Sequence, residues 1–330
     1  MAKQIVAANS GVMAFGMSIT TGALSLNTVN EWVNRFGQFI GGPVSNYAIG
    51  GTGLPSMASQ ANLYAPYGGR TQVAVVDGPL NDVRQAGPGC LPSIKPALDS
   101  MLSVLFSGYF RGAAWPAPNV VRAGAWSSLG TSFGGRSPYF SSNSPMQTVD
   151  PNASITFQFS GDTVFLHGFA SETDDWLDMD IEIDGVPRGS TDWAFTARPG
   201  AGKQAVAAAF DGCGAGAHTI KVKAPSVIPA GRKCVIDGIQ TPNKAAPLLL
   251  GGVPNIPNWA AYGATGTWAD AQACNAIIEQ VAGEWEARGY PVGYVPIENI
   301  RSWNPDGVHP VDRGHLNWTL CYFGGIVIGP

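Results

Sequence analysis

The spacing of apolar residues changes twice along this chain of 330 residues, and that change constrains the fold more than any other feature. Residues 12–108 and the stretch after about 246 alternate short apolar runs with helical spacing, whereas residues 110–243 alternate apolar and polar positions. A period near 3.6 is typical of amphipathic helices, and a period of two is typical of half-buried strands. The sequence therefore predicts two differently built parts.

The two ends of the chain predict strands that alternate with helices. Four apolar runs predict buried strands, at residues 11–15, 73–76, 247–250 and 292–297. Helical spacing predicts helices over 28–40, 94–105 and 267–289, the last with Thr267 as N-cap and Gly289 as its stop, and a further helix from Asp312. This alternation predicts a parallel sheet with helices on both faces.

The middle of the chain predicts an antiparallel β-sandwich inserted into the α/β domain. Residues 155–159, 177–183, 217–223 and 233–239 read as strands, and Asp184-Gly185 is a turn signal after the second of them. The expected domains are therefore residues 1–109 plus 244–330 for the α/β part and 110–243 for the insert. The insert is a candidate carbohydrate-binding module.

Several residues of the insert have two interpretations. Its tryptophans can stack on sugar rings or pack in the core, and they are Trp115, Trp126, Trp176 and Trp193. An acidic set can bind calcium or form a solvated strand face, which the alternation favours, and it comprises Asp174, Asp175, Asp178, Asp180, Glu182 and Asp184. His167, His218 and, outside the insert, His315 are expected to be structural.

The charge and cysteine content of the chain argue against nucleic acid, membranes and zinc as partners. The net charge of −4 offers no basic footprint for nucleic acid or an anionic membrane. We expect no membrane insertion and no signal peptide, which leaves a cytoplasmic protein or one carried on a phage particle. The five cysteines lack CxxC spacing, so we expect free thiols rather than a zinc site, with a Cys213–Cys234 disulfide as the alternative.

Ser18 is the candidate nucleophile. It follows the first predicted strand in the segment Phe15-Gly16-Met17-Ser18, a glycine-flanked turn. Open α/β sheets place their sites at the carboxyl ends of the strands, where this hydroxyl would be exposed. The alternative is a strand-end serine with no chemical role.

Asp306 and His309 are the candidate orienting acid and base. They lie three residues apart in a loop bounded by Pro305 and Pro310. The carboxylate can accept a hydrogen bond from one ring nitrogen, which leaves the other to face Ser18. The alternative is a tight turn with an incidental histidine.

Two further segments could supply donors for an oxyanion. Gly50 and Gly51 let the backbone approach a ligand, and Asn81 follows the second strand with an amide side chain. The alternatives are a flexible loop and ordinary turn chemistry.

In this order the segments resemble the SGNH (GDSL-type) hydrolases over residues 12–108 and 245–322. The matching blocks are Gly16-Met17-Ser18, the Gly50-Gly51 loop, Pro79-Leu80-Asn81-Asp82 and Asp306-Gly307-Val308-His309. The sequence departs from the family twice, because Met17 stands where the family has aspartate and Pro79 where it has glycine.

The resemblance implies a flavodoxin-like, three-layer α/β/α domain with a jelly-roll-like sandwich inserted. It implies Ser18 as nucleophile, His309 as base and Asp306 as its orienting acid. It also implies an oxyanion hole made by the N–H groups of Ser18 and Gly51 and the side chain of Asn81. Neither a metal nor an organic cofactor is expected.

The expected activity is hydrolysis of O-acyl esters, with acetyl groups on a polysaccharide as the substrate. This expectation follows from the resemblance of the insert to sandwiches that accompany polysaccharide-deacetylating members of the family. One alternative is a lipid or short-acyl esterase without glycan preference. Another is a glycan-binding or structural phage-particle protein on a weakened hydrolase scaffold. The oligomeric state is left open.

Overall fold

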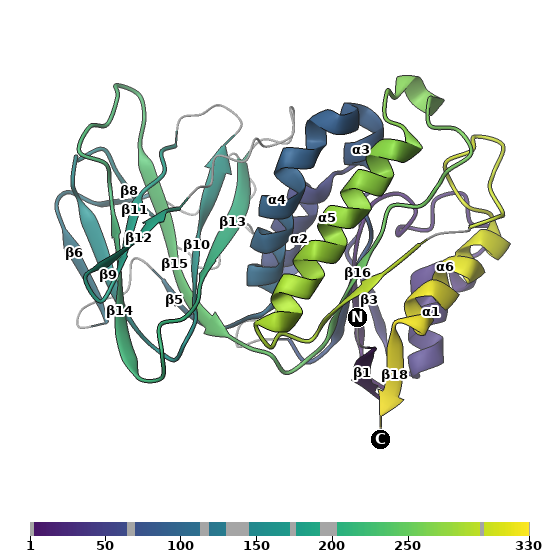
Figure 1. Cartoon of the computed structure of the whole chain (residues 1–330), viewed down its shortest axis with the longest axis horizontal. Helices are drawn as coiled ribbons and strands as arrows, with labels where there is room; N and C mark the ends of the chain where they lie inside the picture. The colour runs from purple at the N-terminus through teal and green to yellow at the C-terminus, as the bar shows by residue number, and fades with distance from the viewer. Residues whose placement is uncertain are drawn as a thin grey trace. The chain divides into compact units, whose positions relative to one another are not determined.

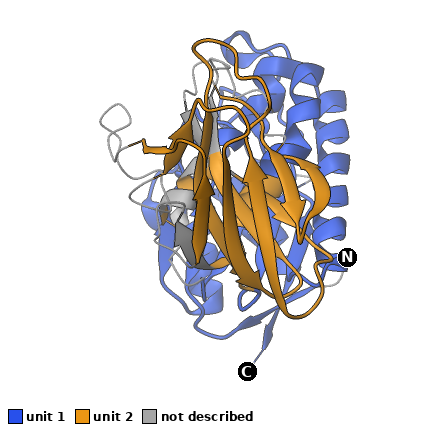
Figure 2. Ribbon diagram, turned by 90° about the vertical axis from the view of Figure 1, so that its left-hand side faces the viewer, with its two compact units in different colours: residues 1–57, 70–98, 244–330 blue, residues 58–69, 99–243 orange. Residues whose placement is uncertain are grey.

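The computed structural model describes residues 3–64, 70–112, 119–129, 145–171, 176–191, 203–297 and 300–329. The chain forms two compact units, coloured separately in Figure 2. Unit 1 comprises Met1–Met57, Arg70–Leu98 and Lys244–Pro330, and unit 2 comprises Ala58–Gly69 and Asp99–Asn243. Unit 1 is thus assembled from segments that lie far apart in the sequence.

A five-stranded parallel sheet forms the centre of unit 1. Its strands are β2 (Val12–Phe15), β3 (Val44–Asn46), β4 (Val73–Val76), β16 (Leu248–Gly251) and β17 (Val292–Val295). They lie in the order β17-β16-β4-β2-β3, and every pair is parallel. Numbered along the chain, this is the order 2-1-3-4-5 of a doubly wound sheet, in which the winding reverses between β2 and β4. The carboxyl ends of these two strands therefore form the expected position of a ligand site.

Burial explains why four of these strands were predicted and β3 was not. All four residues of β2, β4 and β16 are buried, so each reads as a continuous apolar run. β3 is a half-exposed, partly polar edge strand of three residues, which leaves no such run. The parallel pair β1 (Gln4–Ala7) and β18 (Ile326–Gly329) was also not predicted.

Helices lie on both sides of the sheet (Figure 1). α1 (Trp32–Ile40) and α6 (Asp312–Gly324) pack together on one side, where the rings of Trp32 and Tyr322 stack at 4.5 Å. α3 (Leu80–Ala86) and α5 (Trp268–Ala287) lie on the other side. The remaining helices are η1 (Thr28–Asn30), α2 (Leu54–Tyr64), η2 (Gly87–Cys90), α4 (Leu91–Leu105) and η3 (Ala261–Gly263).

The predicted helix ends are correct for α5 and partly wrong for α1. Thr267 caps α5 in a reciprocal capping box with Asp270, and Gly289 follows the helix with a left-handed φ of 77°. The helix predicted over 28–40 is instead a short 3₁₀ turn followed by α1. Val29 lies in that turn and is 54% exposed, so its place on the buried helix face was wrong.

The strands of unit 2 form two antiparallel sheets. One contains β5 (Ser107–Gly112), β7 (Ser127–Ser128), β8 (Met146–Thr148), β10 (Val164–Ser171), β13 (Lys203–Phe210) and β15 (Cys234–Pro242). The other contains β6 (Val120–Ala123), β9 (Ser154–Ser160), β11 (Asp180–Ile183), β12 (Val186–Ser190) and β14 (Ala217–Lys223). Inward side chains of both sheets, such as Phe157 and Leu166, form one apolar cluster, so the pair of sheets is a β-sandwich.

The predicted turn at Asp184-Gly185 is present. Both residues have positive φ, 50° and 78°, as a tight hairpin between β11 and β12 requires. The side chain of Asp184 is engaged by His218, whose Nδ1 lies 2.7 Å from Oδ2. Asp180 is exposed in β11, which agrees with a solvated strand face. Of the acidic set, Asp174 and Asp175 lie outside the described residues, as do Trp115 and Trp193.

The other residues singled out from the sequence differ in how deeply they are buried. His167 is buried with Nε2 3.1 Å from the Ser107 hydroxyl, and His315 is fully buried in α6. Trp126 packs against the sandwich core, and Trp176 is half-buried. All five cysteines are free thiols. In the described ranges, no helix is long and apolar enough to cross a membrane.

We expect Leu249→Ala to lower the free energy of unfolding by roughly 2–5 kcal/mol, because Leu249 is fully buried in β16, an interior strand of the sheet. Urea unfolding followed by tryptophan fluorescence measures the change. Leu26→Ala is the matched control, since Leu26 is 91% exposed and should lose little. Equal losses in the two variants would contradict this account of the core.

Candidate active site

The Ser18 turn begins directly after β2, at the point where the winding of the sheet reverses. The N–H groups of Thr21 and Ala23 donate to the carbonyl oxygens of Met17 and Ser18, each at 2.9 Å. The Thr21 hydroxyl also donates to the Ser18 carbonyl at 2.7 Å. Three hydrogen bonds thus hold a half-buried serine at the carboxyl end of the sheet.

Gly16 allows this turn to pack against the end of β4. A Cβ atom added at Gly16 would lie 2.2 Å from Thr20 Oγ1 and 2.9 Å from Asp77 Cβ, so any larger residue would push them away. The Thr20 hydroxyl donates to Asp77 Oδ2 at 2.7 Å, and the N–H of Gly78 donates to Asp77 Oδ1 at 3.1 Å. Burial raises the pKa of Asp77 to about 7 despite these hydrogen bonds.

The Asp306–His309 loop is closed on itself by its own backbone. The N–H of Asn304 donates to the His309 carbonyl at 2.8 Å, and Gly307 adopts a left-handed φ of 69°. Asp306 Oδ1 accepts the N–H groups of Val308 and His309 at 3.0 and 3.1 Å. The backbone of the loop therefore orients the Asp306 carboxylate independently of the imidazole.

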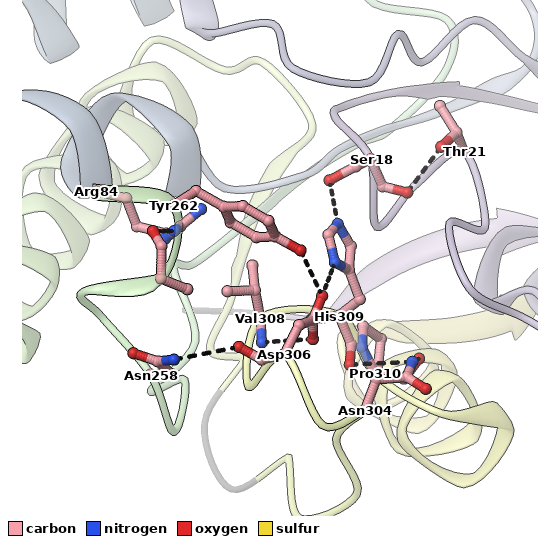
Figure 3. A network of polar contacts seen from close by, with 11 residues as sticks. Ser18, Thr21, Arg84, Asn258, Tyr262, Asn304, Asp306, Val308, His309 and Pro310 are labelled. Atoms are coloured by element: carbon pink, nitrogen blue, oxygen red, sulfur yellow. Dashed lines mark hydrogen bonds and ion pairs between the residues drawn. The ribbon is translucent and has the colours of Figure 1, made fainter. Parts of the chain in front are cut away.

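Ser18, His309 and Asp306 form a continuous chain of hydrogen bonds, drawn in Figure 3. His309 Nδ1 lies 2.6 Å from Asp306 Oδ2, and His309 Nε2 lies 2.9 Å from Ser18 Oγ. Burial raises the pKa of Asp306, but the hydrogen bonds from the His309 ring and from two backbone N–H groups outweigh it, and the pKa falls to about 2. Because an ionised carboxylate can only accept, Nδ1 is the donor and Nε2 of the neutral ring can accept the Ser18 proton.

Asn81 and Asp82 both bind the glycine loop that follows β3. The Asn81 side chain donates to the Thr52 carbonyl at 2.9 Å, and Asp82 Oδ2 accepts the N–H of Leu54 at 2.9 Å. A Cβ atom on Gly53 would lie 2.4 Å from Asp82 Oδ1, so glycine permits this approach. Asn81 and Asp82, which follow β4, thus hold the glycine loop in place.

The two glycines of this loop differ in their relation to Ser18. A Cβ atom on Gly50 would lie 3.8 Å from Ser18 Cβ, whereas one on Gly51 would meet nothing within 4 Å. Gly51 is exposed and has a left-handed φ of 77°. The oxyanion donors assigned from the sequence to Ser18, Gly51 and Asn81 stay a prediction.

Three site residues were missed by sequence reasoning. Asp77 directly follows a predicted strand, and that position could have identified it. Tyr262 donates its hydroxyl to Asp306 Oδ2 at 3.2 Å, and Arg84 binds the carbonyl of Ala261. No local pattern distinguishes these last two. Within the described ranges, no group of three or more histidine, cysteine or acidic residues is placed to hold a metal ion.

Comparisons with known proteins give weak likenesses in structure alone. No family model and no curated protein matches the chain. A two-domain esterase active on acetylated mannans is 12% identical, with 72% of this chain and 91% of that chain covered, at a TM-score of 0.39. A family two carbohydrate esterase from Cellvibrio japonicus is 14% identical over 59% and 53% of the two chains, at 0.25.

A third similar structure is the carbohydrate-binding module CBM36 in complex with calcium and xylotriose. It is 17% identical, with 40% of this chain and 97% of that chain covered, at a TM-score of 0.26. Carbohydrate esterases and a carbohydrate-binding module are thus among the structural neighbours. Because each TM-score is below 0.5, the site geometry, and not this likeness, supports the function proposed below.

We expect Asp77→Asn to change how stability depends on pH. Between its usual pKa of 3.8 and about 7, Asp77 keeps its proton in the native state and loses it on unfolding, so its contribution to stability falls as pH rises. Asparagine keeps the size of the side chain and removes this titration. The free energy of unfolding of the variant minus that of the parent should therefore rise from pH 4 to 7, by at most ~1.4 kcal/mol per pH unit, and then level off.

Urea unfolding of both proteins at intervals from pH 4 to pH 8 measures this difference. Other titrating groups are common to the two proteins and cancel. A difference that is constant across the range would contradict a raised pKa for Asp77.

Proposed function

We propose that the chain is a serine esterase of the SGNH type that hydrolyses O-acyl esters. The observation that carries the proposal is the hydrogen-bonded chain from Ser18 Oγ through His309 to Asp306, at 2.9 and 2.6 Å. Both distances lie within the reach that proton transfer needs. Residues 291 positions apart meet in this geometry at the carboxyl end of a doubly wound sheet.

In the proposed reaction, Ser18 and His309 act in both half-reactions, the formation of the acyl-enzyme and its hydrolysis. His309 Nε2 accepts the Ser18 proton as Oγ attacks the ester carbonyl, and the proton then passes to the departing alcohol. The acyl group remains on Ser18 until water attacks it, with His309 again taking the proton. The bond between Ser18 Oγ and the acyl carbon then breaks, the acid is released, and the proton returns from His309 to Ser18 Oγ. Asp306 stays ionised and stabilises the imidazolium form, in keeping with its lowered pKa of about 2.

The two departures from the family pattern are compatible with a working site. The Met17 sulfur accepts the N–H of Asn81 at 3.2 Å, so this position still supplies an acceptor to the Asn81 block. Pro79 is the N-cap of α3, where its missing N–H would have had no partner within the helix. Neither departure removes a group that transfers a proton.

We further propose acetyl esters on a polysaccharide as the substrate class and residues 110–243 as an inserted, glycan-binding domain. The support is the β-sandwich of unit 2, which is the architecture of the accessory modules that the insert resembles in sequence. The fold of the α/β domain would then be the three-layer arrangement of the family.

We expect Ser18→Ala to lower kcat/KM for p-nitrophenyl acetate by about 10⁴-fold or more, because the acyl-enzyme can no longer form. Ser160→Ala is the control, since Ser160 is an exposed serine of β9. Acetate release from acetylated polysaccharide is measured in parallel. Equal rates for parent and Ser18→Ala would overturn the proposal. Cleavage of longer acyl esters but not of acetylated polysaccharide would favour a lipid or short-acyl esterase.

We expect Asn81→Ala to lower kcat by about 10²–10³-fold with a smaller change in KM, if its amide stabilises the oxyanion. The amide also binds the Thr52 carbonyl, so thermal unfolding must be measured beside the kinetics. Asn34→Ala is the control, since Asn34 binds the backbone of η1. If the variant unfolds at a lower temperature than the parent, and both its fold and its activity return on cooling, Asn81 acts in loop packing instead.

A further inference from the structure

The segment between β16 and α5, residues 252–267, is bonded to the Asp306–His309 loop at three points. The N–H of Asn258 donates to the Gly307 carbonyl at 3.1 Å, and its side chain donates to the Asp306 carbonyl at 3.4 Å. A Cβ atom on Gly307 would lie 2.6 Å from Asn258 Cβ, so the two backbones are in close contact. The third point is the Tyr262 hydroxyl, which donates to Asp306 Oδ2 at 3.2 Å.

Tyr262 has an unfavourable backbone conformation that burial does not explain. Its φ of 59° and ψ of 29° are left-handed, a region disfavoured for a residue with a bulky side chain. Its side chain is 77% exposed, so little apolar surface is removed from water in return. Strained residues of this kind cluster at functional sites.

Arg84 holds the segment in place from α3, one helical turn after Asn81. Its guanidinium donates to the Ala261 carbonyl and lies 5.7 Å from the centre of the Tyr262 ring. Its own carbonyl accepts the N–H groups of Thr265 and Gly266 at 3.0 and 2.9 Å. The helix that carries Asn81 therefore also fixes the backbone on both sides of Tyr262.

The Tyr262 hydroxyl reaches the same oxygen atom that binds the imidazole (Figure 3). Asp306 Oδ1 is occupied by two backbone N–H groups, and Oδ2 accepts both His309 Nδ1 and Tyr262. The hydrogen bond to Asp306 and the charge of that carboxylate raise the pKa of Tyr262, so the phenol remains a donor. With the phenol in place, each carboxylate oxygen accepts two donors.

We infer that Tyr262 is a positioning residue for the hydrolysis proposed above, on which this inference rests. Its hydroxyl fixes Asp306 Oδ2 against His309 Nδ1 and shares the charge that faces His309. The backbone strain at Tyr262, held by Arg84, is what brings the hydroxyl to this oxygen. Tyr262 does not transfer a proton itself and acts through Asp306.

Tyr262→Phe tests the inference because it keeps the exposed ring and removes only the hydroxyl. We expect kcat for p-nitrophenyl acetate to fall about tenfold, with KM and the thermal midpoint nearly unchanged, because the orienting contact is lost while the substrate surface is kept. Tyr64→Phe, at an exposed tyrosine of α2, is the matched control. It should match the parent in both parameters.

A second readout needs no turnover. The His309 Nδ1 proton, bonded to Asp306, gives a downfield proton NMR resonance that is assigned by its loss in Asp306→Ala. We expect this resonance to shift in Tyr262→Phe and to stay in place in Tyr64→Phe. An unchanged resonance, or a loss of activity confined to KM, would overturn the inference while leaving the esterase proposal intact. A shifted resonance in a protein that cleaves no ester would sustain the positioning role and overturn the esterase proposal.

Discussion

The pairing of β4 with β16 is the constraint on which the rest of unit 1 depends. It aligns Val75 with Leu249 and Val76 with Leu250, across 174 residues of sequence that include all of the sandwich strands. All the residues of the two strands are buried, so the apolar surface they remove from water repays the entropy of closing so long a loop. Without this pairing, Ser18 and His309 would not be brought together in one sheet.

Two carboxylates near the sheet edge have opposite environments. Asp77 is fully buried, and its pKa rises to about 7 because its hydrogen bonds do not offset desolvation. Asp306 is partly exposed and accepts four donors, and its pKa falls to about 2. The carboxyl group of Asp77 is therefore suited to internal packing near neutral pH. The carboxyl group of Asp306 is suited to be a permanently charged partner of an imidazole.

The clamps around the site show where sequence reasoning stops. Asn81 was recognised from its place after a strand. Its side chain, however, binds the Thr52 carbonyl, and its N–H donates to the Met17 sulfur, so it joins segments that lie far apart in the chain. Tyr262 carries no periodic, turn or motif signal, and its left-handed backbone lies between residues that Arg84 binds, Ala261 and Thr265. Such contacts depend on which loops the sheet brings together, and local patterns do not encode that.

The sequence by itself determined the α/β and sandwich parts, the apolar strands that lead to Ser18, and the local Asp306–His309 spacing, because burial and turn chemistry act over a few residues. Only the tertiary structure decided that His309 meets Ser18, that Asp77 is buried beneath the Ser18 turn, and that Tyr262 shares Asp306 with the imidazole. The reason is physical: each of these contacts joins residues that follow different strands, and which strands become neighbours is a property of the assembled sheet.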